Sequence, residues 1–236
     1  MNSTHIIHLK ETESTNTYAK ALLKSGEPFT PYTLIYTDNQ TAGRGRLGRN
    51  WESQEGNSLC MSLIVPFPHN PRITLIAALA VYDALYDICG ENLRIKWPND
   101  LIIDNKKLCG ILTESTNTAA VIGIGVNLNQ TDFSEEIRHK ATSLKLLTQC
   151  TYSPSELAEK IGTSIRNLLE NTQGVISEEL VIKYTHLCAN MGNLVGFRDT
   201  EGFAIGVRED DGALMILTKD GLEAVTSGEV TVSGIY

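Results

Sequence analysis

The segment YTLIYTDNQTAGRGRLGRNWESQEGNSLCMSLIVP, Tyr32 to Pro66, carries two apolar runs joined by a loop rich in glycine and arginine. Residues 32–38 and 58–66 contain many β-branched and large apolar side chains, which is typical of strands. The residues between them show no apolar stripe with helical spacing. The segment therefore predicts a strand, a loop and a second strand, without an intervening helix.

The spacing of the loop glycines matches that of a dinucleotide-binding turn. Residues 43–48 spell G-x-G-x-x-G, but such a turn also requires a helix opening at the glycines and an acidic residue about 20 positions further on. Residues 49–59 lack the helical pattern, and no Asp or Glu occurs between Glu55 and Asp83. We therefore exclude NAD as the ligand.

The three arginines of this loop indicate another kind of anion. Guanidinium groups pair with carboxylates and phosphates in a bidentate geometry, and glycines let the backbone approach a ligand closely. Because Arg44, Arg46 and Arg49 repel one another, we expect a poorly ordered loop until an anion binds. A solvated basic loop is the alternative, but the flanking Gln40 and Trp51 favour a lid that packs on a ligand.

Apolar periodicity and capping signals predict the other elements of a first, α+β domain. Strands are expected at residues 5–11, 92–97, 100–104, 107–115 and 119–129. Helices are expected from Ser14 or Asn16 to Gly26, from Asn70 to about Cys89, from a capping box at 153–156, and from about Ser177 to Asn190. The third helix should turn one apolar stripe inward, formed by Leu157, Ile161, Ile165 and Leu168. We predict a mixed β-sheet with helices packed on it over residues 1–190.

The pattern changes after Met191. Five short runs of alternating polarity follow, and Asp211-Gly212 and Asp220-Gly221 lie where hairpin turns are required. The chain shows no internal repeat and no low-complexity linker. We therefore predict a small second domain over residues 191–236, an SH3-like β-barrel.

Composition and charge limit the function classes. The chain has 236 residues, of which 42% are hydrophobic and 20% charged, as is typical of a folded globular protein. Its net charge of -8 argues against general affinity for nucleic acids, which are held mainly by Lys and Arg. The positive charge of residues 41–49 therefore belongs to a site rather than to the whole surface.

The cysteines and the N-terminal residues favour a cytoplasmic protein. The five cysteines are widely spaced and form no C-x-x-C pair, which predicts reduced thiols rather than disulfides or a zinc site. The histidines show no metal-ligand spacing, so no metal-binding residue is assigned. We find no signal-peptide pattern, and the apolar run at residues 73–82 is too short to span a bilayer, so no membrane association is expected.

A second group of polar residues lies between predicted strands. The turn KWPNDL at 96–101 projects Asn99 and Asp100 from a corner that its proline fixes. Lys106 and Lys107 follow, and because strand side chains alternate, one of them faces inward and the other faces solvent. An inward lysine on an otherwise apolar strand requires an anion. The pattern alone does not decide which lysine that is.

Four motifs occur in the order in which one protein family carries them. They are ESTN at residues 13–16, QTAGRGRLGR with its tryptophan at 40–51, KWPNDL at 96–101 with KKLCGIL at 106–112, and GIGVNLN at 123–129. The chain resembles the biotin protein ligases, and the likeness covers nearly its whole length, including the C-terminal β unit. Four separate motifs make this resemblance specific.

The resemblance implies a reaction in two steps. The biotin carboxylate attacks the α-phosphate of ATP and gives biotinyl-5′-adenylate and pyrophosphate, with Mg²⁺ accompanying the nucleotide. A lysine of a biotin carboxyl carrier domain then attacks the mixed anhydride and releases AMP. Joining two anions costs Coulomb energy, so cationic side chains should neutralise the carboxylate and the phosphate. A lid that excludes water would protect the adenylate.

The resemblance also implies roles for individual residues. The catalytic residues are expected to be Lys107, Arg44 and Arg46, to which we add Asp100. Biotin contacts are expected from Ser14, Thr15, Asn16, Gln40, Arg44, Gly45, Arg46, Lys107 and Gly125. ATP or adenylate contacts are expected from Arg46, Arg49, Trp51, Asn99, Lys107 and Asn127. For Asp100 three roles stay open: orienting or deprotonating the acceptor lysine, anchoring the metal, and anchoring the loop.

The N-terminal residues indicate whether DNA is a partner of the protein. Regulatory members of the family carry an N-terminal DNA-binding domain, whereas here the catalytic motifs begin almost at Met1. We therefore expect a ligase-only form that does not bind DNA. Family members often pair through the sheet of the catalytic domain, so a homodimer is a reasonable expectation.

Two rival functions stay open. A lipoate or octanoate ligase or transferase shares the catalytic fold, and a transferase would use a cysteine nucleophile, for which Cys109 is the candidate. A small buried thiol in the core is the alternative role for this residue. A sensor of biotin or nucleotide would keep the pocket without the chemistry, and the presence of Arg44, Arg46 and Lys107 argues against it.

Overall fold

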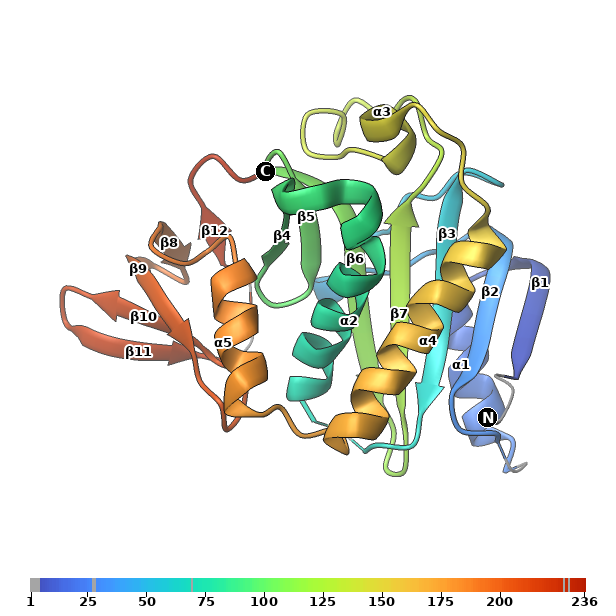
Figure 1. Ribbon diagram of the computed structural model, residues 1–236, viewed down its shortest axis with the longest axis horizontal. Coiled ribbons are helices and arrows are strands. Elements are labelled where there is room, and N and C mark those ends of the chain that lie inside the picture. Colours follow the sequence, from blue (N-terminus) through green and yellow to red (C-terminus); the bar gives the residue numbers. More distant parts are fainter. Residues whose placement is uncertain (1–4, 27–28, 69, 227, 229) are drawn as a thin grey trace.

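The computed structural model describes residues 5–26, 29–68, 70–226, 228 and 230–236. Its largest element is a sheet of seven strands (Figure 1). Strands β1 and β2 are parallel, and every other neighbouring pair is antiparallel, which confirms the predicted α+β class with a mixed sheet. In spatial order the strands are β1 (Ile6–Thr12), β2 (Thr33–Gln40), β3 (Ser58–Val65), β7 (Ala120–Asn127), β6 (Lys106–Ser115), β5 (Asp100–Ile103) and β4 (Leu93–Lys96).

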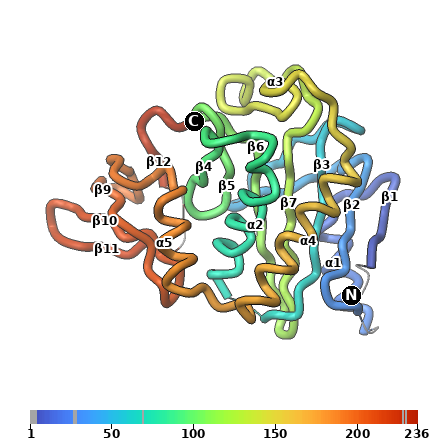
Figure 2. The backbone as a smooth tube through the Cα atoms, in the orientation of Figure 1, coloured from blue at the N-terminus to red at the C-terminus, as the bar shows by residue number. Residues whose placement is uncertain are grey.

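Helices cover both faces of this sheet, as Figures 1 and 2 show. Helix α1 (Thr15–Lys24) packs on one face, where Ala19 and Ile35 belong to a small apolar cluster. Helices α2 (Arg72–Cys89) and α4 (Pro154–Thr172) contact each other and cover the opposite face. Because side chains alternate along each strand, the sheet supplies one apolar cluster to α1 and a larger one to α2 and α4.

Local sequence signals set the helix ends. The Ser14 hydroxyl accepts a hydrogen bond from the first turn of α1, so Ser14 rather than Asn16 is the N-cap. Ser153 caps α4 in the same way, as its capping box predicts. The predicted inward stripe of α4 is wrong at its last position: Leu169 is fully buried, whereas Leu168 is half-buried.

Helix α2 is the most buried helix of the core. By length and composition the segment Arg72–Asn92, with a mean hydropathy of 1.6, could cross a membrane, the one such helix in the part of the chain that the structure describes. The expectation that this apolar run is too short was therefore wrong. In the fold, 61% of the 18-residue apolar window in this segment is buried, because α2 packs on β4, β6 and α4.

Two shorter helices precede the C-terminal strands. The predicted helix after Ser177 is α5 (Glu178–Leu187), which ends earlier than expected because Cys188 turns away to form a parallel bridge with Ile95 of β4. Helix α3 (Leu144–Thr148) was not predicted. Its five residues are too few to show a helical period in the sequence.

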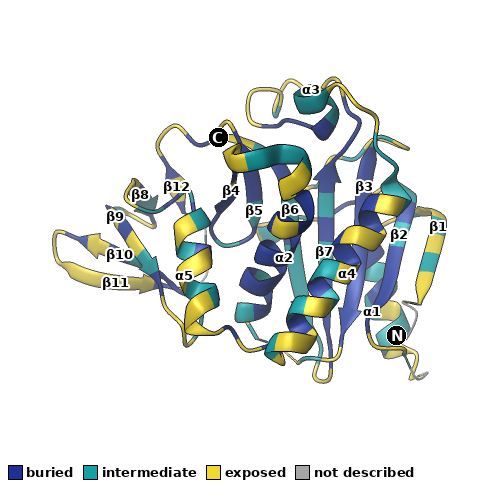
Figure 3. Cartoon of the chain, viewed as in Figure 1, coloured by how far each residue is buried: buried dark blue, intermediate teal, exposed yellow. Residues whose placement is uncertain are grey.

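The last five strands form a separate antiparallel sheet where five short runs were predicted. Gly212 and Gly221 have φ of 75° and 128° at the two hairpin turns, where glycine is favoured. Within the described residues no pairing joins the outermost strands β11 and β12, so the sheet is open and barrel closure stays a prediction. Figure 3 shows β11 largely exposed and the central strands of the first sheet buried. The strands are β8 (Leu194–Phe197), β9 (Thr200–Val207), β10 (Leu214–Thr218), β11 (Gly221–Val225) and β12 (Thr231–Val232).

Candidate active site

A pocket lies on the α1 side of the first sheet, over β3, β6 and β7. It is lined by the start of α1, the end of β2, the arginine loop (residues 41–51), the turn between β4 and β5, and the floor strands. Asp100 contacts the pocket residue Lys107, whereas Arg49 and Asn127 lie outside the lining. Eleven of the predicted site residues line the pocket: Ser14, Thr15, Asn16, Gln40, Arg44, Gly45, Arg46, Trp51, Asn99, Lys107 and Gly125.

The start of α1 is fixed by buried polar contacts. The Thr15 N–H donates to Gln40 Oε1 at 3.0 Å, which ties the helix to the end of β2. Ser62 Oγ lies 2.7 Å from Thr15 Oγ1 and 2.6 Å from Asn16 Oδ1. Sequence reasoning missed Ser62, yet a hydroxyl within a fully buried strand needs polar partners, and that signal could have identified it.

Asn16 is also held by a charged pair that was not predicted. Its Nδ2 donates to Glu114 Oε2 at 2.9 Å and to the Leu112 carbonyl at 3.2 Å. Lys20 Nζ lies 2.5 Å from Glu114 Oε1. With its Oδ1 facing Ser62, the Asn16 amide has protein partners at both ends, and these contacts fix its orientation.

Three glycines keep the floor of the pocket flat. A Cβ at Gly123 would lie 2.4 Å from Asn16 Oδ1, and one at Gly125 would lie 2.3 Å from Trp51 Cε2. A Cβ at Gly110 would lie 3.0 Å from the Trp51 ring. Any larger residue at these positions would displace the side chains that rest on the strands.

A β-bulge in β6 interrupts the alternation of side chains. Leu101 of β5 pairs with Cys109, but Ile102 pairs with Lys107, so Leu108 is an extra residue without a partner opposite. A bulge of one residue shifts every side chain on one side of it to the other face of the sheet. The bulge therefore sets the direction of the lysine that precedes it.

The bulge brings Lys107 into the pocket. Strict alternation would place Lys107 on the face opposite to Gly110, but both lie on the pocket side. Lys106 is exposed. On the edge away from β5, beyond the last β6–β7 pair, the backbone of Lys107 pairs with the following loop: its N–H donates to the Lys140 carbonyl at 2.7 Å and its carbonyl accepts from the Thr142 N–H at 2.9 Å.

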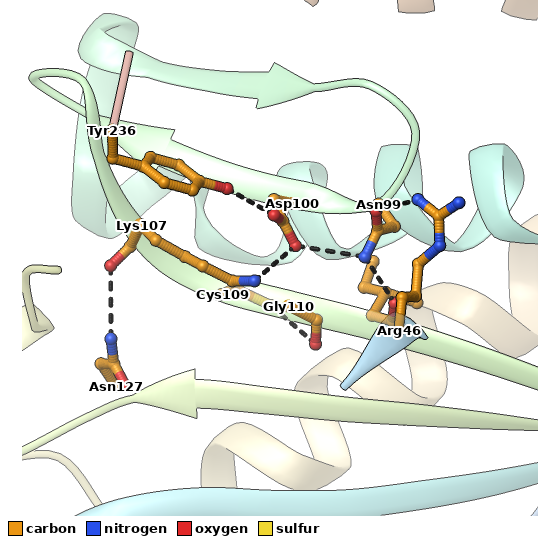
Figure 4. A network of polar contacts seen from close by, with 9 residues as sticks. Arg46, Asn99, Asp100, Lys107, Cys109, Gly110, Asn127 and Tyr236 are labelled. Atoms are coloured by element: carbon orange, nitrogen blue, oxygen red, sulfur yellow. Dashed lines mark hydrogen bonds and ion pairs between the residues drawn. The ribbon is translucent and has the colours of Figure 1, made fainter. Parts of the chain in front are cut away.

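A chain of polar contacts connects Lys107 to the arginine loop (Figure 4). Lys107 Nζ lies 2.8 Å from Asp100 Oδ1, to which Asn99 Nδ2 also donates at 3.2 Å. Arg46 donates from Nη1 to Asn99 Oδ1 at 2.9 Å. The Tyr236 hydroxyl donates to Asp100 Oδ2, a contact across 136 residues that the sequence did not reveal.

The arginine loop is held by backbone hydrogen bonds at its ends and by one inside it, from the Gly45 N–H to the Arg49 carbonyl at 2.7 Å. Its last residue donates from the Trp51 N–H to the Gly43 carbonyl at 3.0 Å. Between the anchors, Leu47 is 69% exposed and adopts a left-handed φ of 55°. Arg44 and Arg49 are exposed as well. The central part of the loop is therefore held by few contacts.

Trp51 lies in the pocket itself. Its ring rests on Gly110 and Gly125, and Lys107 Nζ lies 5.6 Å from the ring centroid. The indole Nε1 is buried and has no hydrogen-bond partner among the described residues. A ligand can lie against Gly125 only if this ring moves, and the unpaired N–H lowers the cost of moving it.

Known proteins share both the sequence and this arrangement of strands. Residues 9–129 match the biotin/lipoate A/B protein ligase family. The chain belongs to this family. It is 33% identical to the bifunctional ligase/repressor BirA of Bacillus subtilis, over 96% of this chain and 73% of that protein. It is 28% identical to the biotin–[acetyl-CoA-carboxylase] ligase of Paracoccus denitrificans, over 96% and 100%.

A solved structure of a ligase from this family supports the same assignment. The biotin protein ligase from Aquifex aeolicus in complex with biotin and ATP aligns with a TM-score of 0.85 and 31% sequence identity. The alignment covers 98% of this chain and 99% of that chain. These relatives confirm the resemblance that the four sequence motifs indicate.

Two residues that the ligase resemblance assigns to the nucleotide lie beside the pocket. Asn127, buried at the end of β7, donates from Nδ2 to the Lys107 carbonyl at 3.2 Å. Gln130 Nε2 lies 3.4 Å from Asn127 Oδ1. Arg49 is exposed at the end of the arginine loop. Their contacts with an adenylate stay predictions.

The buried cysteines of this ligase-family chain are poor nucleophiles. Cys109 is fully buried on the core side of β6, and burial raises its pKa well above the ordinary value of a thiol. Burial also raises the pKa of Cys60 to about 12. A thiol with a raised pKa stays protonated near neutral pH, and the thiolate is the reactive form. These facts argue against a transferase that works through Cys109.

Proposed function

We propose that the protein is a biotin protein ligase that forms biotinyl-5′-AMP from biotin and ATP and transfers biotin to a carrier lysine. The observation that carries this proposal is the β6 bulge, which brings Lys107 into one pocket with Thr15 and the arginine loop. The Aquifex aeolicus ligase, which shares the fold over nearly the whole chain, has been solved with biotin and ATP.

In the first step a carboxylate oxygen of biotin attacks the α-phosphorus of ATP. A bond between the carboxyl oxygen and phosphorus forms, the bond from the α-phosphorus to pyrophosphate breaks, and pyrophosphate leaves. Both reactants are anions, so Lys107, Arg44 and Arg46 would neutralise the charge that gathers between them. Asn99 already orients Arg46 for this task. Closure of the arginine loop would exclude water from the anhydride.

Magnesium accompanies ATP in this proposal. Among the described residues no three His, Cys, Asp or Glu side chains gather where they could hold a metal. Asp100 fits only a minor role as a metal ligand, because Lys107 and Tyr236 already contact its two oxygens. The residues fit an ion held mainly by phosphate oxygens and water, as Mg²⁺ commonly is. Such an ion would act as a Lewis acid on the phosphates.

In the second step the amine of the acceptor lysine attacks the acyl carbon of the adenylate. An amide bond forms, the acyl–oxygen bond to the phosphate breaks, AMP leaves, and the nitrogen loses a proton. Of the three roles considered for Asp100, its contacts favour anchoring. Both of its oxygens accept hydrogen bonds from protein donors, and Asn99 connects it to Arg46. We infer that Asp100 keeps Lys107 and the loop in place.

The ligands would divide the pocket between them. The hydroxyls and amides at the start of α1, with Gln40, suit the ureido group of biotin, and Gly45 and Gly125 suit close approach of the ring and chain. The adenylate would extend past Lys107 and Asn99 toward Arg49 and Asn127. Trp51 would leave the floor glycines and pack under the closed loop, near the nucleotide.

We propose further properties at the level of the whole molecule. The C-terminal sheet would curl in the manner of an SH3-like barrel. The enzyme would work in the cytoplasm without DNA or membrane binding. A homodimer would pair through the first sheet, whose edge strand β1 is largely exposed. Light scattering after gel filtration would measure the dimer directly.

The function is tested by incubating the protein with ATP and Mg²⁺, an apo biotin carrier domain, and either biotin or octanoate. We expect pyrophosphate release that requires biotin, followed by a mass increase of the carrier by one biotinyl group. A mass increase with octanoate instead would show a lipoate-type ligase. No pyrophosphate release at saturating biotin and ATP would show a sensor without the chemistry.

A further inference from the structure

Tyr236, the last residue of the sequence, follows β12 and directs its hydroxyl toward Asp100 (Figure 4). Its hydroxyl donates a hydrogen bond to Asp100 Oδ2. Lys96 Nζ lies 3.8 Å from the centroid of its ring. Its backbone N–H donates to the Asn105 carbonyl at 3.3 Å. The hydroxyl, the ring and the backbone each have a partner, so Tyr236 is held at three points.

The contacts of Asp100 divide its two oxygens between different partners. Oδ1 lies 2.8 Å from Lys107 Nζ and accepts from Asn99 Nδ2 at 3.2 Å. Oδ2 accepts from the Tyr236 hydroxyl. A carboxylate that accepts hydrogen bonds at one oxygen only can turn about its last side-chain bond. The torsion angle about that bond has a broad, nearly two-fold distribution. A donor at each oxygen removes that freedom.

We propose that Tyr236 is a positioning residue for adenylate formation, in that it fixes the Asp100 carboxylate, which in turn fixes the Lys107 ammonium. This inference rests on the proposed ligase function. Lysine has a flexible four-carbon stem, so its charge needs an external anchor to stay at one position. Displacement of a charged group by about 1 Å can slow a reaction about 100-fold.

A second contact shows that the C-terminal residues serve the site at two points. Arg46 donates from Nη2 to the Gly228 carbonyl at 3.3 Å, while its Nη1 holds Asn99. The residues that follow β11 therefore contact Asp100 through Tyr236 and the arginine loop through Gly228. We assign to them the task of setting the distance between the cationic groups of Lys107 and Arg46.

The experiment compares Tyr236→Phe with the wild-type protein in biotin-dependent exchange of pyrophosphate into ATP. The variant keeps the ring over Lys96 and removes only the hydroxyl. We expect kcat to fall about 10-fold, with the KM values for biotin and ATP within about two-fold, because orientation and not ligand binding is lost. The thermal midpoint should stay within about 2 °C, since one partly exposed hydrogen bond is removed.

Two further variants make the test specific. Tyr86→Phe removes a tyrosine hydroxyl from the outside of α2 and should leave kcat within about two-fold. In an Asp100→Asn background, Tyr236→Phe should lower kcat by less than about two-fold more, because residues that act through one another are not additive.

Three results would overturn the inference: an unchanged kcat in Tyr236→Phe, a raised KM with kcat unchanged, or an equal loss with and without Asp100→Asn. A wild-type protein without biotin-dependent exchange would instead overturn the proposed function. The wild-type measurement thus separates the two failures.

Discussion

The floor of the pocket and the arginine loop are stabilised in different ways. Strands β6 and β7 pair along their length, and their pocket face is flattened by Gly110, Gly123 and Gly125. The arginine loop has backbone hydrogen bonds at its ends and a turn between Gly45 and Arg49, but Leu47 at its centre is 69% exposed. A region with few buried contacts opens at low free energy, whereas a paired and buried one does not. The floor is the preformed half of the site, and the loop is the half that can move.

Trp51 connects these two halves. It belongs to the loop, yet its ring rests on Gly110 and Gly125 of the floor. Movement of the loop therefore changes the space above the floor. The comparison predicts that a Cβ added to a floor glycine damages binding strongly, whereas one added to Gly45 in the loop does less damage. It also predicts that ligands change the exposure of the loop.

The largest effect is expected from the lysine that the bulge selects. Lys107→Ala should lower the rate of adenylate formation about 100- to 1,000-fold, as loss of a preorganised charge partner typically does. Lys106→Ala, a change at an exposed neighbour, should stay within about three-fold. Pyrophosphate exchange measures both variants. A larger loss in Lys106→Ala would mean that the direction assigned to the two lysines is reversed.

A matched pair of glycine substitutions compares floor and loop directly. A Cβ at Gly125 would lie 2.3 Å from Trp51, whereas one at Gly45 would meet only an ordinary contact at 3.5 Å. Gly125→Ala should raise the KM for biotin about 10- to 100-fold, since overpacking costs roughly 1–3 kcal/mol. Gly45→Ala should raise it less than Gly125→Ala does, because the loop can shift to restore its close approach to biotin. Equal effects of the two variants would contradict a rigid floor beneath a yielding loop.

The sequence predicted the elements that depend on neighbouring residues. The cap at Ser153 and the glycine hairpins after Asp211 and Asp220 follow from side-chain chemistry within a few positions, and the structure contains them. Most of the candidate site residues that the motifs indicated also line one pocket. Their individual contacts with biotin and ATP stay predictions.

The features that the sequence did not predict depend on distant partners. The β6 bulge lies next to Lys107, whose backbone pairs with Ile102 on one edge and with residues 140–142 on the other, and alternation along one strand cannot reveal it. The contact of Tyr236 with Asp100 spans 136 residues. Ser62 is different, because a lone hydroxyl in a buried run is a local signal that burial must be compensated.

Limited proteolysis tests the mobile half of the site. Trypsin should cut after Arg44, Arg46 or Arg49 in the protein alone, because the loop is exposed and held by few contacts. Biotin with ATP should slow this cleavage about 10-fold, since ligands that bind the closed form lower the open population. Mass spectrometry identifies the cut sites. The same cleavage rate with and without ligands would refute the lid.

The smallest effect is expected from the thiols. Burial holds the pKa of Cys109 above the ordinary thiol range and raises that of Cys60 to about 12, so both stay protonated and unreactive from about pH 6 to 9. Iodoacetamide at about pH 8 should therefore modify the exposed Cys150 first and leave ligase activity within about two-fold. Peptide mapping measures the modification, and pyrophosphate exchange measures the activity.

Cys109→Ser should likewise retain biotin transfer, because the proposed reaction passes from adenylate to lysine without a thioester. Complete loss of transfer in a folded Cys109→Ser variant would instead place a cysteine nucleophile in the floor, and the preformed half of the site would then carry a covalent step.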